Sequence, residues 1–195
     1  MPETYKKRLL KELSENGYSY KDLDDIFQQK SLQEKEVEII LKWLPLMYTE
    51  HYGAADILVR ALISSSEPFP PDVLISLFES DLNFSLKSGI ANALAYAKTG
   101  DISGWIKGQL LNDYSTERSL LIDGLKTKGR FADNRELISF LKGIFDKYHD
   151  DAVLKLFKKY GNAEDIPFLK EKAELSEKKL AKAINKTIEG IKNNF

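Results

Sequence analysis

Apolar residues recur every three to four positions along almost the whole chain, which is the period of an amphipathic helix. No segment alternates apolar and polar residues between hairpin turns, so the pattern predicts no strand. The apolar stretches are short and are separated by glycine, proline or clusters of polar residues. We therefore expect an all-α protein built from many short helices.

The first two expected helices lie before residue 30. Residues 5–13 share one apolar face, and this pattern stops at Gly17. Ser19, with Asp22 three residues later, has the spacing of an N-cap ahead of the next apolar run.

The next two expected helices differ in character. Ser31 and Glu34 have the spacing of a capping box ahead of residues 36–47, where Pro45 is expected to kink or end the helix because it has no amide hydrogen. Residues 54–64 are apolar on nearly every side, so we expect this helix to be covered from several directions.

The remaining expected helices follow in pairs, and glycines mark the joints between them. They cover residues 72–78 and 85–97, 102–113 and 115–128, 134–148 and 150–160, and 164–174 and 176–191. Gly100, Gly129 and Gly161 each follow a helical pattern, and we expect them to take the left-handed cap conformation that glycine adopts most easily. Their spacing of about 30 residues is typical of helical repeat arrays.

Three segments resemble HEAT repeats. A glycine and an acidic or amide residue precede a helix in residues 159–174 and 96–113, and a proline in one helix with Arg-Ala-Leu in the next occurs at Pro45 and Arg60. The turn near Asn134 departs from the repeat by two extra residues.

The resemblance implies a right-handed α-α superhelix, a HEAT-like solenoid of stacked antiparallel helix pairs. It predicts a single domain over residues 1–195, with an N-terminal capping pair at 3–30 and about five HEAT-like pairs over 32–195. A pair of about 30 residues cannot bury its apolar face alone, which agrees with stacking.

Composition narrows the classes of function. The 195 residues are 43% hydrophobic and 30% charged, as in globular proteins, and the absence of cysteine excludes disulfides, thiol nucleophiles and zinc–thiolate sites. No 18-residue apolar run or secretory signal occurs, so we expect a cytoplasmic protein without a membrane partner. Net charge is −1, with 10 lysines and arginines against 15 carboxylates in residues 1–97, and 19 against 15 afterwards.

Candidate catalytic chemistry is sparse. His149 precedes Asp150 and Asp151, but adjacent residues seldom point at one metal ion, and aspartates at a helix start favour capping. His51 stands alone in a loop, and no phosphate-binding glycine motif occurs. Trp43 and Trp105 fit core positions, with an exposed anchor for a partner as the alternative. We expect no enzyme activity, no cofactor and no metal site.

The sequence therefore favours a non-catalytic scaffold or adaptor that binds a protein partner through a concave or edge surface. Because the second helices of such pairs line the concave side, the candidate partner-binding residues are Arg60, Asn92, Arg118 and Asp123. The alternative comes from the resemblance, since some HEAT-like solenoids are DNA glycosylases for alkylated bases. Lysines interspersed with glutamates, rather than clustered, argue against a nucleic-acid partner. The partner's identity and the oligomeric state stay open.

Overall fold

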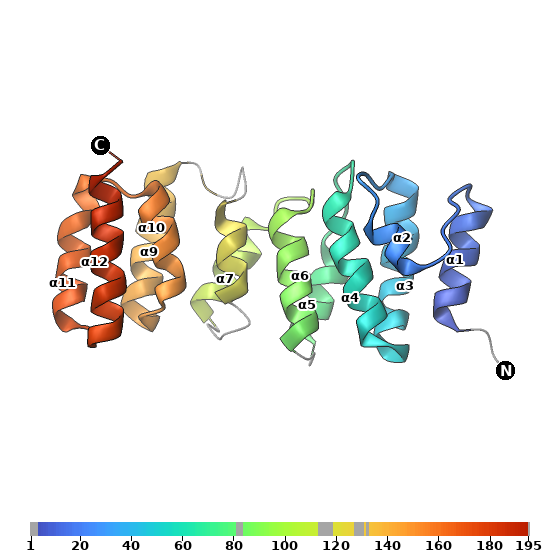
Figure 1. Ribbon diagram of the computed structural model, residues 1–195, viewed down its shortest axis with the longest axis horizontal. Coiled ribbons are helices and arrows are strands. Elements are labelled where there is room, and N and C mark those ends of the chain that lie inside the picture. Colours follow the sequence, from blue (N-terminus) through green and yellow to red (C-terminus); the bar gives the residue numbers. More distant parts are fainter. Residues whose placement is uncertain (1–3, 81–83, 113–118, 127–130, 132, 195) are drawn as a thin grey trace.

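The chain folds into helices joined by turns. The computed structural model describes residues 4–80, 84–112, 119–126, 131 and 133–194, and none of these residues lies in a β-strand. The protein is therefore all-α, which confirms the prediction from the apolar period. The helices lie side by side in a row that follows chain order, with the two termini at opposite ends (Figure 1).

The elements alternate between two sets, which we call the first and the second helices. The first helices are α1 (Tyr5–Glu15), α3 (Glu34–Glu50), α5 (Asp72–Glu79), α7 (Ser103–Asn112), α9 (Asn134–Tyr148) and α11 (Ile166–Leu175). The second helices are α2 (Leu23–Phe27), α4 (Tyr52–Ala61), α6 (Phe84–Tyr96), the 3-10 helix η2 (Leu120–Lys126), α10 (Leu154–Tyr160) and α12 (Lys178–Lys192). Short 3-10 turns are η1 (Leu62–Ser64), η3 (Asp151–Val153) and η4 (Ala163–Asp165).

Several helices contact the helix two places along the chain as well as a neighbour in sequence, as α3 does with α5 and α4. Among the second helices, α2 contacts α4, α4 contacts α6, α6 contacts η2, and α10 contacts α12. Among the first helices, α1 contacts α3 and α3 contacts α5. The helix α4, predicted to be covered from several directions, packs against α2, α3 and α6.

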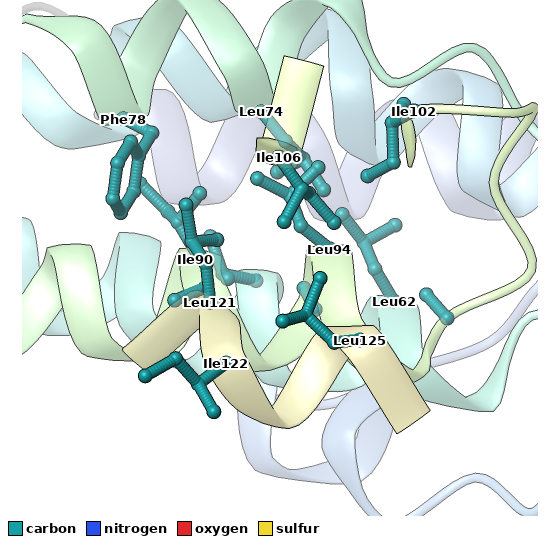
Figure 2. Close-up of a cluster of buried hydrophobic side chains, with 14 of the residues drawn as sticks. Leu62, Leu74, Phe78, Ile90, Leu94, Ile102, Ile106, Leu121, Ile122 and Leu125 are labelled. Carbon is teal, nitrogen blue, oxygen red and sulfur yellow. The ribbon is translucent and has the colours of Figure 1, made fainter. Parts of the chain in front are cut away.

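The apolar core runs along the row without a break at the joints between pairs. Figure 2 shows its central part, where side chains from η1, α5, α6, α7 and η2 meet. The labelled residues are all buried: Leu62, Leu74, Phe78, Ile90, Leu94, Ile102, Ile106, Leu121, Ile122 and Leu125. Burial of apolar area stabilises a fold by roughly 25 cal/mol per Å², so these contacts between neighbouring pairs stabilise the row.

The loops that follow successive second helices are hydrogen-bonded to one another. Leu32, after α2, donates its amide to the carbonyl oxygen of Ser64 at 2.9 Å and accepts from the amide of Ser66 at 2.8 Å. Phe69 repeats the arrangement one pair later, because its amide donates to the carbonyl oxygen of Lys98 at 2.9 Å. The same contact therefore recurs between successive helix pairs.

The predicted N-caps of the second and third helices are wrong by two or three residues. Helix α2 is capped by Asp22, which forms a capping box with Asp25, and Ser19 has no part in it. Helix α3 begins with a box formed by Gln33 and Glu36 instead of Ser31 and Glu34. Leu32 is fully buried and bonded to the neighbouring loop, so the helix begins only after it.

Helix α3 does not end at Pro45. It continues to Glu50, and the proline ring is exposed. Because this side of the helix faces solvent, water can reach the carbonyl group that the missing amide hydrogen leaves without a partner.

The left-handed conformation predicted for the joint glycines is also wrong. Gly161 has φ −73°, Gly100 is not left-handed, and Gly129 lies outside the described residues. Gly17 (φ 92°) and His149 (φ 53°) are the left-handed residues in the described part of the chain. Glycine is required at residue 161 for steric reasons, because a Cβ atom there would lie 2.5 Å from the carbonyl oxygen of Phe157.

This steric requirement predicts opposite effects for two glycine substitutions. We expect Gly161→Ala to lower the free energy of unfolding by about 1–3 kcal/mol, because backbone must move to admit the methyl group. Gly108, inside α7, has no atom within 4 Å of its Cβ position, so Gly108→Ala should raise stability by about 0.5–1 kcal/mol through helix propensity. Urea denaturation measures both, and equal changes at the two sites would contradict the steric explanation.

Candidate functional site

Three of the four predicted binding residues, Arg60, Asn92 and Asp123, lie on three consecutive second helices. Arg60 is on α4, Asn92 on α6, and both side chains are half-buried. The backbone of Asp123 lies in η2, whereas Arg118 falls outside the described residues. Because α4, α6 and η2 pack in that order, these positions belong to one layer of the protein.

Arg60 is held by its own helix. Its Nε donates to Asp56 Oδ2 at 2.7 Å, one helical turn earlier. Asp56 in turn packs against Gly89 of α6, where a Cβ atom would overlap its other carboxylate oxygen, Oδ1. That oxygen is buried and has no hydrogen-bond partner among the described residues. The Arg60–Asp56 ion pair therefore helps to pack α4 against α6. Arg60 is less available to a partner than its sequence position predicts.

Exposed apolar side chains stand at the C-terminal ends of three adjacent second helices. Phe27 is 48% exposed at the end of α2, Ile63 is 37% exposed in η1 after α4, and Tyr96 is 51% exposed at the end of α6. Each directly follows a buried residue of the same helix end: Ile26, Leu62 and Ala95. We call Phe27, Ile63 and Tyr96 the apolar row. The sequence carries a signal for it that the predicted binding residues missed, an extra apolar residue directly after a core residue at each of these helix ends.

The two tryptophans support the packing of first helices. The Nε1 atom of Trp43 donates to Glu12 Oε2 at 2.7 Å, and Nε1 of Trp105 donates to Glu79 Oε1 at 2.8 Å. Each ring also contacts an aromatic ring of the preceding first helix. Both side chains pack against the core and are only partly exposed, as the core interpretation expects.

A cavity of about 550 Å³ opens where α1 and α2 meet the joint between α3 and α4. Its apolar lining includes Leu23, Met47 and Ile57. Lys6 and Asp22 form an ion pair at its rim, at 2.8 Å. His51 caps α4 there, because its Nδ1 accepts from the amide of Ala54 at 3.2 Å. These polar groups are satisfied by local structure, and their arrangement suggests no catalytic chemistry.

The histidine and aspartates at residues 149–151 also act locally. His149 ends α9 in the left-handed conformation, and Asp150 caps η3 by accepting from the amide of Ala152 at 2.7 Å. Within the described ranges, no group of three or more histidine, aspartate or glutamate side chains is placed to hold a metal ion.

A cluster of paired charges surrounds Asp165. Its fully buried carboxylate accepts from Arg135 at 2.8 and 3.1 Å and from the amide of Asn162 at 2.8 Å, and it pairs with Lys142 at 2.8 Å. Burial raises the pKa of Asp165, but the hydrogen bonds from Arg135, Lys142 and Asn162 outweigh it and lower the pKa to about 2. These contacts join α9 to the start of α11, so we interpret them as a structural clamp.

No family model, no curated protein and no solved structure matches this chain. Among the described residues, no helix combines the length and apolar character needed to cross a bilayer.

Proposed function

We propose that this chain is a non-catalytic protein-binding scaffold, a HEAT-like solenoid that docks a partner on the face formed by its second helices. The repeated contacts between helices two places apart, and the repeated bonds between successive loops, support this architecture. The apolar row is the observation that carries the proposed function.

The apolar row suits a polypeptide partner. Aromatic and branched side chains that remain exposed on a folded protein provide the contact area on which protein interfaces depend. Neighbouring packed helices lie about 8–10 Å apart, so side chains on α2, α4 and α6 can contact successive parts of one partner segment. Phosphate groups would instead require basic side chains at these positions.

The surrounding charges support a binding role without catalysis. The carboxylates with the clearest interactions serve as caps or pair with cations of neighbouring helices, as Asp22, Asp150 and Asp165 illustrate. Such groups stabilise the fold and are not free to exchange protons with a substrate.

The test compares two matched double variants as baits in a lysate of cells that produce this protein. Phe27→Ser/Tyr96→Ser alters the apolar row, and Leu46→Ser/Leu111→Ser alters two similarly exposed leucines on the first helices α3 and α7. We expect wild type and the Leu46/Leu111 variant to retain the same partner in quantitative mass spectrometry, and the Phe27/Tyr96 variant to retain at least about tenfold less.

Circular dichroism must first show that all three proteins are folded. Equal retention of the partner by all three would contradict the assignment to the second helices. Salt-sensitive retention on duplex DNA, in place of a protein partner, would favour the DNA-binding alternative.

A further inference from the structure

The lysines of α10 and α12 form a separate basic surface at the C-terminal end of the second-helix face. Helix α10 carries three exposed lysines and no carboxylate, and α12 carries five exposed lysines and one glutamate, Glu189. In a chain with net charge −1, two adjacent helices therefore concentrate strong positive charge. We call Lys155, Lys158, Lys182 and Lys186 the lysine surface.

Contacts between the helices place these lysines together. Lys158 packs across α12 at Gly190, where a Cβ atom would lie 2.5 Å from Lys158 Cε. The side-chain amide of Asn194 donates to the carbonyl oxygen of Lys158 at 3.0 Å. Before α10, Asp150 and Asp151 line a pocket together with Glu177 and Lys179 at the start of α12, so the two helices run parallel. Lys155 and Lys186 therefore both lie about one turn before the contact of Lys158 with Gly190. Lys182 lies one further turn back along α12.

Among the residues that the structure describes, no carboxylate pairs with the ammonium groups of the lysine surface. None of the four lysines forms an ion pair with a described residue. Three lysines of the first helices α7, α9 and α11 are paired instead, Lys107 with Glu136, Lys142 with Asp165 and Lys172 with Asp146. A polar end cap would explain lysines on the outer side of α12, but α10 is covered by α12 and is not an end.

We propose that the lysine surface docks an acidic segment of a protein, rich in aspartate and glutamate. This inference rests on the proposed scaffold function and names the chemistry of one part of the partner. Lys182 and Lys186 are separated by about 6 Å along the helix, and carboxylates four residues apart on a partner helix have the same spacing.

The residue types favour a polypeptide over a nucleic acid. Residues 136–195 contain no arginine, so the surface has no guanidinium fork for bidentate contact with phosphate or a base edge. The first half of the chain is acidic and would repel a long polyanion that extends along the row.

The experiment uses a fluorescein-labelled peptide of 15 glutamates and measures anisotropy at low and physiological salt. The Lys155→Gln/Lys158→Gln/Lys186→Gln variant is compared with Lys7→Gln/Lys21→Gln/Lys30→Gln, which removes equal charge from exposed lysines without ion pairs to described residues near the N-terminus. We expect about tenfold weaker binding for the first variant and less than about twofold for the second.

Three results would overturn this inference. Equal losses in the two variants would show that only total charge matters. If duplex DNA of equal charge binds more tightly than the peptide, and the same three lysine substitutions abolish that binding, the surface is a nucleic-acid surface instead. If the peptide fails to bind while partner retention still depends on Phe27 and Tyr96, the scaffold function stands and the acidic segment is refuted.

Discussion

Replacing Asp165 with alanine is expected to lower the free energy of unfolding by about 2–4 kcal/mol, because it removes a buried carboxylate together with its hydrogen bonds and ion pairs to Arg135 and Lys142. The carboxylate is fully buried, and its contacts join two first helices, α9 and α11. Chemical denaturation monitored by circular dichroism measures the change.

The neighbouring Glu164 provides the control. Its side chain is 77% exposed and approaches Arg135 only at 3.6 Å, so Glu164→Ala should change stability by less than about 0.5 kcal/mol. Similar losses for the two variants would contradict the clamp.

The low pKa of Asp165 predicts a specific pH dependence. Its pKa is about 2 in the folded protein against an ordinary 3.8, so its charge stabilises the fold fully above about pH 4. That contribution, about 2 kcal/mol, should be lost as pH falls through 2. The stability difference between wild type and Asp165→Asn should therefore shrink over this window, and a difference independent of pH would contradict the charged clamp.

Replacing Phe78 with alanine is expected to destabilise the protein by about 3–5 kcal/mol. Phe78 is fully buried on α5, and its ring meets Trp105 of α7 edge-on at 5.6 Å between centroids. The substitution leaves a cavity between two helix pairs and removes an aromatic contact.

Denaturation together with tryptophan fluorescence measures this effect, and Phe27→Ala is the matched control. Phe27 is 48% exposed, so its loss should cost less than about 1 kcal/mol. If the helix pairs stack in a row, each pair contacts mainly its neighbours. Hydrogen exchange in the Phe78→Ala variant should then accelerate most in α5–α7 and least in α11–α12. Uniform acceleration along the chain would argue against that organisation.

Local sequence pattern predicted the helices better than their ends. The expected range 134–148 matches α9, and residues 54–64 match α4 with η1, because their apolar periods are long and regular. The caps near Ser19 and Ser31 were misplaced because several polar residues there can cap a helix, and packing of Leu32 decides between them.

Interactions between distant residues could not be read from the sequence. The need for glycine at residue 161 comes from a close approach between its Cβ position and Phe157, whereas a cap pattern predicts only a left-handed turn. The half-buried state of Arg60 follows from its pairing with Asp56, which packs on Gly89 more than 30 residues away. The Asp165 clamp depends on Arg135 in the same way.

Small-angle X-ray scattering of the monomer tests the stacked arrangement of helix pairs most directly. A compact globule of 195 residues has a radius of gyration of roughly 16 Å. A row of helix pairs with the termini at opposite ends (Figure 1) predicts a clearly larger radius and a distance distribution with a long tail. A value near 16 Å with a symmetric distribution would contradict the stack, and with it the continuous second-helix face on which the proposed function depends.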